Sequence, residues 1–290
     1  MQSYSRRLIY HQWLRDTSAD FSAVSDTPML DARLILCFCA NLSRTELLAK
    51  KDSDFTENRI IIAQCSLLKR LRAQGYPIAY LTGQKEFYHH IFHVCPGVLI
   101  PRPDSECLIE AIREAHARDS YASLRDVGTG PGTLALTLAA LYPRWQITGS
   151  DISPHSEKMF NKNQECLNAR NARFLRASLL HGGEKKYDII IANLPYLTPK
   201  ETKERSHWKE PSLALNGKGK DGLKLIKKLI RQARHRCQKI YLEADPAQMP
   251  ALSGYLRKHG FSHIQIFQDL QGLRRIILGC RSALFPARNL

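Results

Sequence analysis

The residues with the clearest chemical content are Asn193, Leu194, Pro195 and Tyr196, which follow an apolar run over residues 189–192. The run predicts a buried strand, so that the four residues form a rigid loop at its end. An Asn amide, a backbone carbonyl and an aromatic ring at one strand end can hold a planar NH2 group. They can accept both of its hydrogens and leave the nitrogen lone pair facing outward. This pattern favours methyl transfer to nitrogen over hydrolysis or redox chemistry.

A glycine-rich segment offers a place for a ligand. A strand is predicted over residues 124–127 and a helix over residues 133–141, and between them lie Gly128, Thr129, Gly130, Pro131 and Gly132. Glycines allow close approach of the backbone to a ligand and tolerate positive φ. The third glycine follows the second too closely for the dinucleotide fingerprint, and no lysine follows as in a P-loop. The segment predicts a nucleotide-type site, with a tight turn that binds nothing as the alternative.

Asp151 ends the next predicted strand, over residues 146–150. An acid at this place can accept hydrogen bonds from both hydroxyls of a ribose, although a capping or surface carboxylate is the alternative. The glycine loop, the strand-end acid and the Asn-Leu-Pro-Tyr loop together form the arrangement of an S-adenosylmethionine-dependent methyltransferase. We therefore expect S-adenosyl-L-methionine as the cofactor.

The elements that must position these residues alternate between strand and helix. Further strands are predicted over residues 172–175, 187–192, 239–243, 263–268 and 274–278, and further helices from residue 154, over 221–237 and over 248–259. Such alternation predicts an α/β fold with a doubly wound, mostly parallel sheet of Rossmann-like type.

The first 75 residues have a different texture, because they contain one proline, Pro28, and no glycine before Gly75. Their apolar residues have helical spacing, and Ser43 with Glu46 matches a capping box. We expect a small helical domain over residues 1–76 that positions a macromolecular substrate. Prolines, glycines and aromatic residues then predict a β-hairpin linker over residues 77–103, followed by a catalytic domain over residues 104–290.

Composition narrows the class of protein. The 290 residues are 43% hydrophobic, as in a globular chain, and hold no apolar run near the roughly 20 residues needed to cross a bilayer. The N-terminus lacks the apolar core of a secretory signal, so a cytoplasmic protein is expected. The eight cysteines form no CxxC pair and the histidines no metal signature, so neither a metal site nor a disulfide is expected. The net charge of +16 indicates an anionic partner such as RNA or a ribosome-bound factor, with a generally basic composition as the alternative.

The chain resembles the HemK/PrmC family over almost its whole length. The segments that carry the resemblance are Asp31-Ala32-Arg33-Leu34, Leu42-Ser43-Arg44-Thr45-Glu46-Leu47, Pro77-Ile78-Ala79-Tyr80-Leu81-Thr82-Gly83, Lys85-Glu86-Phe87-Tyr88, Pro96-Gly97-Val98-Leu99-Ile100-Pro101-Arg102-Pro103-Asp104-Ser105-Glu106, and Glu210-Pro211-Ser212-Leu213-Ala214-Leu215 with Asp221-Gly222-Leu223.

The resemblance implies a class I S-adenosylmethionine-dependent methyltransferase that modifies the side-chain amide nitrogen of a glutamine in a peptide chain release factor. It places the catalytic and glutamine contacts on Asn193, Leu194, Pro195 and Tyr196. It places the cofactor contacts on Gly128, Thr129, Gly130, Pro131, Gly132, Asp151, Leu179 and Asn193.

Two residues depart from the family pattern. The family loop is usually Asn-Pro-Pro-Tyr, and Leu194 here replaces the first proline. Leu194 still supplies a carbonyl, and Pro195 still biases it toward extended geometry, but the locked φ of a proline is lost. The third strand usually ends with an acid near the adenine amine. This chain has Ser178 there, which we expect to be a further cofactor contact, since it can accept a hydrogen bond although it carries no charge.

Three other functions compete with this interpretation. The Asn-Leu-Pro-Tyr loop also resembles that of ribosomal RNA adenine methyltransferases, but those enzymes carry their extra domain after the catalytic domain, and here it comes first. A glutamine on a ribosomal protein is a second alternative. A non-catalytic relative that acts as a binding module is the third, and the two departures at Leu194 and Ser178 are its support.

Overall fold

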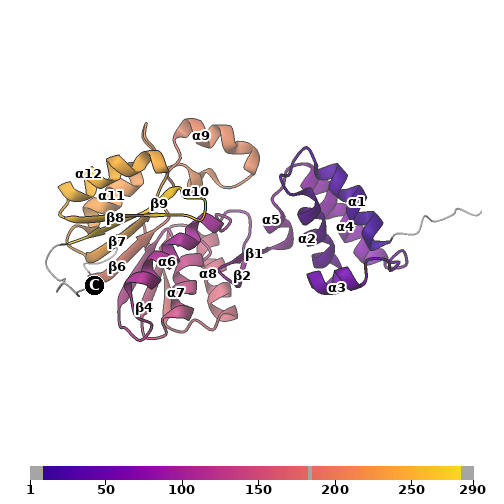
Figure 1. Cartoon of the computed structure of the whole chain (residues 1–290), viewed down its shortest axis with the longest axis horizontal. Helices are drawn as coiled ribbons and strands as arrows, with labels where there is room; N and C mark the ends of the chain where they lie inside the picture. Colours follow the sequence, from indigo (N-terminus) through magenta and orange to yellow (C-terminus); the bar gives the residue numbers. More distant parts are fainter. Residues whose placement is uncertain (1–8, 182–184, 282–290) are drawn as a thin grey trace, which may run out of the picture. The chain divides into compact units, whose positions relative to one another are not determined.

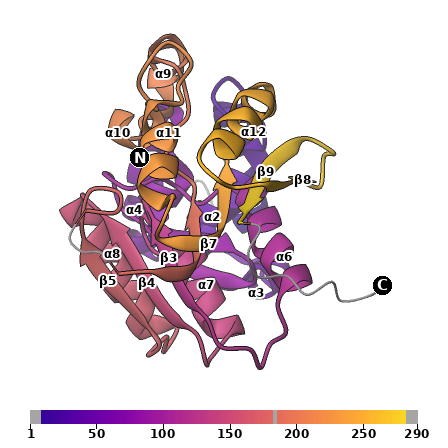
Figure 2. The ribbon, with the colours of Figure 1, turned by 90° about the vertical axis from the view of Figure 1, so that its left-hand side faces the viewer.

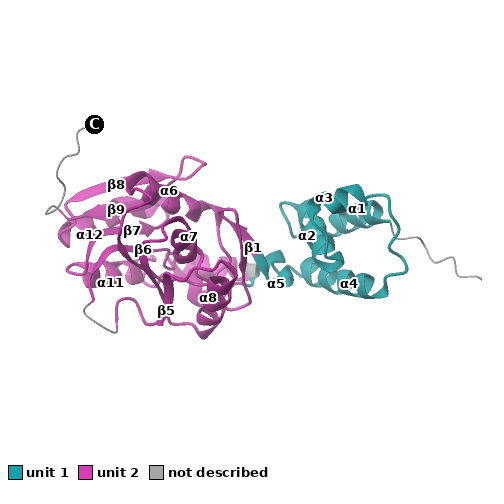
Figure 3. Cartoon of the chain, turned by 90° about the horizontal axis from the view of Figure 1, so that it is seen from below, with its two compact units in different colours: residues 1–84, 207–209 teal, residues 85–206, 210–290 magenta. Residues whose placement is uncertain are grey.

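The computed structural model describes residues 9–181 and 185–281. It divides into two compact units, one formed by Met1–Gln84 with His207–Lys209 and the other by Lys85–Ser206 with Glu210–Leu290 (Figure 3).

The first unit is helical. Its described helices are α1 (Tyr10–Phe21), α2 (Pro28–Ala40), α3 (Arg44–Ala49), α4 (Arg59–Ala73) and α5 (Ile78–Thr82). Their apolar faces enclose a small core that includes Trp13, Phe21, Ile35 and Cys65. The predicted capping box is present at the start of α3, where the Ser43 hydroxyl accepts from the Glu46 N–H and the Glu46 carboxylate accepts from the Ser43 N–H.

The predicted hairpin is also present. Strand β1 (Gln84–Phe87) pairs with β2 (His90–His93) in a two-stranded sheet. Both turn residues, Tyr88 and His89, have positive φ, at 47° and 63°, which is the backbone geometry of a tight two-residue hairpin turn. Phe87 and Phe92 are fully buried and join the core of the second unit.

The second unit is built on a seven-stranded sheet with strand order β5-β4-β3-β6-β7-β9-β8 (Figures 1 and 2). The strands are β3 (Ser123–Val127), β4 (Gln146–Asp151), β5 (Ala172–Arg176), β6 (Tyr187–Ala192), β7 (Cys237–Glu243), β8 (His263–Gln268) and β9 (Arg274–Cys280). The pairs from β5 to β7 are parallel, and β9 is antiparallel to both of its neighbours. The doubly wound, mostly parallel sheet predicted from the sequence is confirmed.

Helices cover both faces of this sheet (Figure 2). One face carries α6 (Glu106–Ala115), α7 (Thr133–Leu141) and α8 (Pro154–Cys166), and the other carries α11 (Lys224–Ala233) and α12 (Met249–Lys258). Strand β6 serves both cores, because Ile189 and Ile191 face one and Ile190 faces the other. This explains why its sequence is a continuous apolar run rather than an alternating one.

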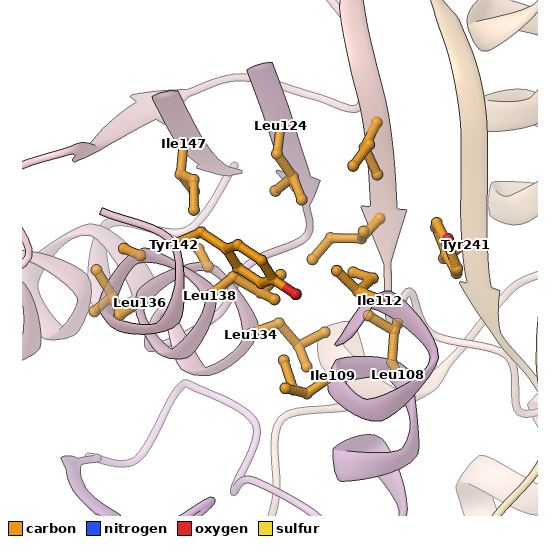
Figure 4. Packing of buried hydrophobic residues seen from close by; sticks show 14 of the residues in the cluster. Leu108, Ile109, Ile112, Leu124, Leu134, Leu136, Leu138, Tyr142, Ile147 and Tyr241 are labelled. Carbon is orange, nitrogen blue, oxygen red and sulfur yellow. The ribbon is translucent and has the colours of Figure 1, made fainter. Parts of the chain in front are cut away.

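The core under α6 and α7 is close-packed. Figure 4 shows Leu108, Ile109 and Ile112 of α6 pointing toward Leu134 and Leu138 of α7. All five side chains are at most 5% exposed, so the two helices that frame the glycine loop are held by burial of apolar area on the order of 1.5–3 kcal/mol for each large side chain.

The segment between β6 and α11 differs from the prediction. A helix was expected over residues 221–237, but α11 spans Lys224–Ala233 and β7 begins at Cys237. Gly222 has φ +70° and the Asp221 carboxylate accepts a hydrogen bond from the Leu223 N–H at 3.0 Å, so these residues form a turn before the helix. The preceding stretch holds α9 (Pro199–Glu204), η2 (Arg205–Trp208) and α10 (Ser212–Leu215). Short 3-10 turns η1 (Pro103–Ser105) and η3 (Pro246–Gln248) precede α6 and α12.

Candidate active site

The glycine loop and the Asn-Leu-Pro-Tyr loop meet at one edge of the sheet. Strands β3 and β6 are parallel neighbours, with Leu124 opposite Ile189 and Asp126 opposite Ile191. The strand order reverses between them, since β3 continues to β4 on one side and β6 continues to β7 on the other. Open α/β sheets bind ligands at the carboxyl ends of the strands beside such a switch point. Residues 193–196, which we term the exit loop, begin there.

A pocket with about 410 Å³ of empty space, part of it open solvent, lies at this edge. Of the residues singled out in the sequence, Gly128, Thr129, Gly130, Pro131 and Asn193 line it. The sequence interpretation assigned no site role to the other residues along its wall, which are Phe87, Leu99, Pro101, Arg102, Ser105, Asp126, Thr133 and Leu134. Gly132, Asp151, Ser178, Leu179 and the rest of the exit loop lie outside this described lining.

Asp151 is not among the described residues that line the pocket, but it contacts the glycine loop, which does line it. Its carboxylate accepts a hydrogen bond from the Gly130 N–H at 3.0 Å through Oδ2 and from the Ser153 N–H at 2.9 Å through Oδ1. An ionised carboxylate has about four acceptor positions, so these two bonds leave room for ribose hydroxyls. The same side chain fixes the loop and the start of α8.

Asp126 is the buried acid of the pocket. It is 1% exposed, and its Oδ2 accepts a hydrogen bond from the Thr129 hydroxyl at 2.6 Å. Its Oδ1 is buried and finds no hydrogen-bond partner among the described residues. Burial raises the pKa of Asp126 to about 7, against the lowering effects of the Thr129 hydroxyl and the backbone N–H of Ala135. A buried carboxylate oxygen without a partner, on a residue that lines the pocket, fits a cationic ligand.

Asn193 directly follows β6, and its side-chain amide is linked through Ser105 to Glu243. Its Nδ2 donates to the Ser105 Oγ at 2.9 Å, and Ser105 donates to the Glu243 Oε2 at 2.6 Å. Glu243 ends β7 and is 2% exposed, and burial raises its pKa to about 7. The available signal for Glu243 was its position, an acid at the carboxyl end of the strand next to β6.

Leu194 contributes its side chain as well as its carbonyl. It is 5% exposed, and a Cβ added to Gly128 would lie 2.7 Å from its Cδ2. Gly128 also has φ +77°, a conformation that side chains disfavour. The exit loop and the glycine loop are therefore in direct contact at a position where one residue must be glycine.

Residues 215–223, which we term the supporting segment, hold the exit loop from behind. A Cβ on Gly217 would lie 1.8 Å from the Gly222 carbonyl oxygen, and a Cβ on Gly222 would lie 2.0 Å from that of Tyr196. The Gln248 side chain donates to the carbonyl oxygens of Tyr196 at 2.9 Å and Asp221 at 2.8 Å. Backbone therefore packs directly on backbone, which fixes the path of the loop.

The loop that carries Ser178 and Leu179 is held by a buried arginine. Leu179 has φ 51°, and its carbonyl accepts from Arg125 Nη2 at 2.9 Å. Arg125 is 3% exposed and also donates to the Ser150 Oγ at 3.1 Å. The sequence reading missed Arg125, because a charged residue inside an apolar strand is not expected to face a buried carbonyl.

Comparison with known proteins agrees with this geometry. The model of the PrmC N-terminal domain matches residues 12–83, and that of the methyltransferase small domain matches residues 103–210. The release factor glutamine methyltransferase of Neisseria gonorrhoeae is 33% identical over 271 residues, which cover 91% of this chain and 97% of that protein. That of Salmonella typhimurium is 32% identical over 280 residues, which cover 93% and 98%. The chain belongs to the release factor glutamine methyltransferase family.

Solved structures support the fold of this family member. A 16S rRNA methyltransferase of T. thermophilus, in complex with AdoMet and guanosine, superposes with TM-score 0.52 at 20% identity, covering 69% of this chain and 50% of that one. The hMettl16 catalytic domain, in complex with an RNA hairpin, gives TM-score 0.56 at 15% identity, covering 73% and 81%. The predicted Rossmann-like methyltransferase fold is therefore confirmed.

Two features are absent from the described residues. Over residues 9–181 and 185–281, no helix combines the length and the apolar character that a membrane span requires. The same part of the chain contains no group of three or more His, Cys, Asp or Glu side chains placed to hold a metal ion.

The supporting segment yields a first prediction. Gly217→Ala should lower the free energy of unfolding by at least about 2 kcal/mol, because its methyl group would overlap backbone oxygens of Gly222 and Pro195. Gly254→Ala is the matched control, since Gly254 lies within α12 with no atom within 4 Å of the added Cβ. It should stabilise the protein by about 0.5–1 kcal/mol. Urea denaturation of both variants measures the difference, and equal midpoints would contradict the proposed contact.

Asp126 yields a second prediction, on stability against pH. Its pKa is raised from 3.8 to about 7 in the folded state, so the stability that this group contributes is fully present below pH 3.8 and is lost as pH rises through about 7. Asp126→Asn removes that loss and should gain stability over wild type at pH 8 relative to pH 5, by on the order of 1 kcal/mol or more. The exposed Asp52→Asn should show no such difference. Thermal unfolding at both pH values tests this, and a gain of equal size at both would refute the assignment.

Proposed function

We propose that this protein transfers the methyl group of S-adenosyl-L-methionine to the side-chain amide nitrogen of a glutamine in a peptide chain release factor. The observation that carries the proposal is the placement of Asn193 on the pocket wall with its Nδ2 bound to Ser105. This leaves the Asn193 carbonyl oxygen as the acceptor for a substrate NH2 group. The relatives named release factor glutamine methyltransferase give the identity of the target.

The residues present fit the cofactor. S-adenosyl-L-methionine, when bound, supplies an electrophilic methyl group on a positively charged sulfonium. The backbone of Gly128 and Gly130 allows close approach, and Asp151 has acceptor positions for ribose hydroxyls. The unpartnered Oδ1 of Asp126 is suited to a cationic group. We assign the contacts to the adenine of the cofactor to the loop of Ser178 and Leu179. Further cofactor contacts are assigned to Thr129, Pro131 and Gly132 of the glycine loop.

The exit loop orients the glutamine. An amide nitrogen is a poor nucleophile because its lone pair is delocalised into the carbonyl. The Asn193 side-chain carbonyl and the Leu194 backbone carbonyl would accept its two hydrogens and leave the nitrogen lone pair free for methyl transfer, and Tyr196 would pack on the amide plane. Pro195 keeps Leu194 extended. Holding the two reacting groups in line supplies much of the rate, since well-oriented sites contribute roughly 7–11 kcal/mol.

The positive charge fits the setting of this substrate. On α11 the exposed basic residues are Lys224, Lys228 and Arg231, on the side away from the core formed by Ile226 and Leu229. Because the net charge is +16, we propose that this face contacts RNA while the enzyme acts near the ribosome.

Reversing the charge at two of these positions, with Lys228→Glu and Arg231→Glu, should weaken salt-sensitive retention on ribosomes while leaving the unfolding midpoint unchanged. Unchanged retention would count against the contact.

Asn193 gives the direct test of the reaction. Asn193→Ala should lower the methylation rate of a purified release factor by about 100-fold or more, because the acceptor for the NH2 hydrogen is lost. The exposed Asn161→Ala in α8 is the matched control and should keep the wild-type rate. Mass spectrometry of the glutamine-containing peptide measures the product.

The choice of substrate needs its own experiment. Wild-type protein is incubated with labelled cofactor and separate pools of release factor, ribosomal proteins and RNA. Label on a release factor glutamine supports the proposal. Label confined to another pool, or full activity of Asn193→Ala, would overturn it.

A further inference from the structure

A hydrogen-bonded chain of three side chains lies behind the exit loop. It joins Asn193 at the end of β6, Ser105 just before α6 and Glu243 at the end of β7. Asn193 Nδ2 donates to Ser105 Oγ at 2.9 Å, and Ser105 donates to Glu243 Oε2 at 2.6 Å. Ser105 and Glu243 are 4% and 2% exposed, so both ends of the bond between them are buried.

The chemistry of these three side chains fixes which group donates and which accepts in each hydrogen bond. A hydroxyl has one hydrogen to donate, and an ionised carboxylate only accepts. With its hydrogen committed to Glu243, Ser105 can only accept from Asn193. The Asn193 amide must therefore turn its NH2 toward Ser105 and its carbonyl oxygen away.

We propose that Glu243, acting through Ser105, is a positioning residue that keeps the carbonyl oxygen of Asn193 turned toward the substrate NH2 group. This inference rests on the proposed function, because it concerns how the glutamine amide is received. Neither Ser105 nor Glu243 needs to touch the reacting atoms for this role.

The direction of donation in these hydrogen bonds depends on the charge of Glu243. A protonated Glu243 can donate to Ser105, which then donates to the Asn193 carbonyl and turns the Asn193 NH2 outward. Two NH2 groups would then face each other, and the substrate would lose its acceptor. The site should therefore work only while Glu243 is ionised.

The groups around Glu243 act in opposite directions on its charge. Asp104, Cys107 and Tyr196 face it from the start of α6 and from the exit loop, and the negative charge of Asp104 opposes ionisation. Arg275 of β9 favours ionisation, but it also pairs with Asp104 at 3.4 Å and Asp269 at 3.1 Å. The hydrogen bond from Ser105 and the nearby amide of Asn193 also favour the ionised form.

The first test needs neither cofactor nor substrate. In the free protein, the side-chain amide resonance of Asn193 is followed by nuclear magnetic resonance across the pH range in which a carbon-labelled Glu243 carboxyl titrates. In wild type and Ser105→Thr, which keeps the hydroxyl, both signals should move with one midpoint. In Ser105→Ala the Asn193 signal should no longer follow Glu243. An Asn193 signal that ignores Glu243 in wild type would overturn the proposal.

The second test measures single-turnover methylation at saturating cofactor. The wild-type rate should rise with pH as Glu243 ionises. In Glu243→Gln, whose side chain cannot ionise, this rising limb of the pH–rate profile should be flat. Ser105→Ala should slow the step by at least about 10-fold, and Ser105→Thr should restore it. Cofactor affinity, measured separately, should change little in Glu243→Gln, because Glu243 is not among the described residues that line the pocket. A limb that persists unchanged in Glu243→Gln, or a full rate in Ser105→Ala, would refute the positioning role.

The two hypotheses fail in distinguishable ways. If wild-type protein methylates no release factor, the proposed function fails, and the resonance test still decides whether Glu243 orients Asn193. If wild-type protein is active but Asn193 and Glu243 titrate independently, only the positioning role fails.

Discussion

The parallel pairing of β3 with β6 is the constraint on which the rest of the site depends. It sets Asp126 opposite Ile191, so that the glycine loop and the exit loop leave the sheet side by side. Leu194 then reaches Gly128, and the pocket forms between the two loops and the segment before α6. A one-residue slip in this register would exchange the two faces of β6 and place Ile190 in the wrong core. The apolar run of β6 therefore positions the chemistry as much as it stabilises the sheet.

Both acids of the site lie at strand ends and are almost fully buried. Asp126 and Glu243 each have a pKa raised to about 7 by burial, which means that ionising either one costs folding free energy. The large cores on both faces of the sheet offset that cost. The two acids have separate tasks, since Asp126 lines the pocket and has an unpartnered oxygen, whereas Glu243 accepts a hydrogen bond from Ser105. Placing charge inside a packed scaffold keeps these groups from reorienting toward water.

Local patterns in the sequence were sufficient for the strands of the sheet, for the hairpin and for the glycine loop and the exit loop. The capping box at Ser43, the hairpin and the sheet strands each depend on neighbours a few residues away. The contacts that complete the site do not: Asn193 and Ser105 are 88 residues apart, and Ser105 and Glu243 are 138 apart. The turn at Gly222, just before α11, was missed for a related reason. A glycine is required there because the Tyr196 carbonyl oxygen lies close to it, and that contact joins residues that are distant in the sequence. The assignment of Asp151, Ser178 and Leu179 to the cofactor remains a proposal.

The contact between Leu194 and Gly128 has a consequence for anyone who exchanges parts between members of this family. The two positions share one volume, so neither can be altered as an independent unit. A proline grafted at 194 would remove the Leu194 Cδ2 that lies 2.7 Å from the Cβ position of Gly128, and a larger residue at 128 would displace the leucine. The exit loop and the glycine loop form one transplantable module, and a chimera whose junction separates them would inherit mismatched halves of it.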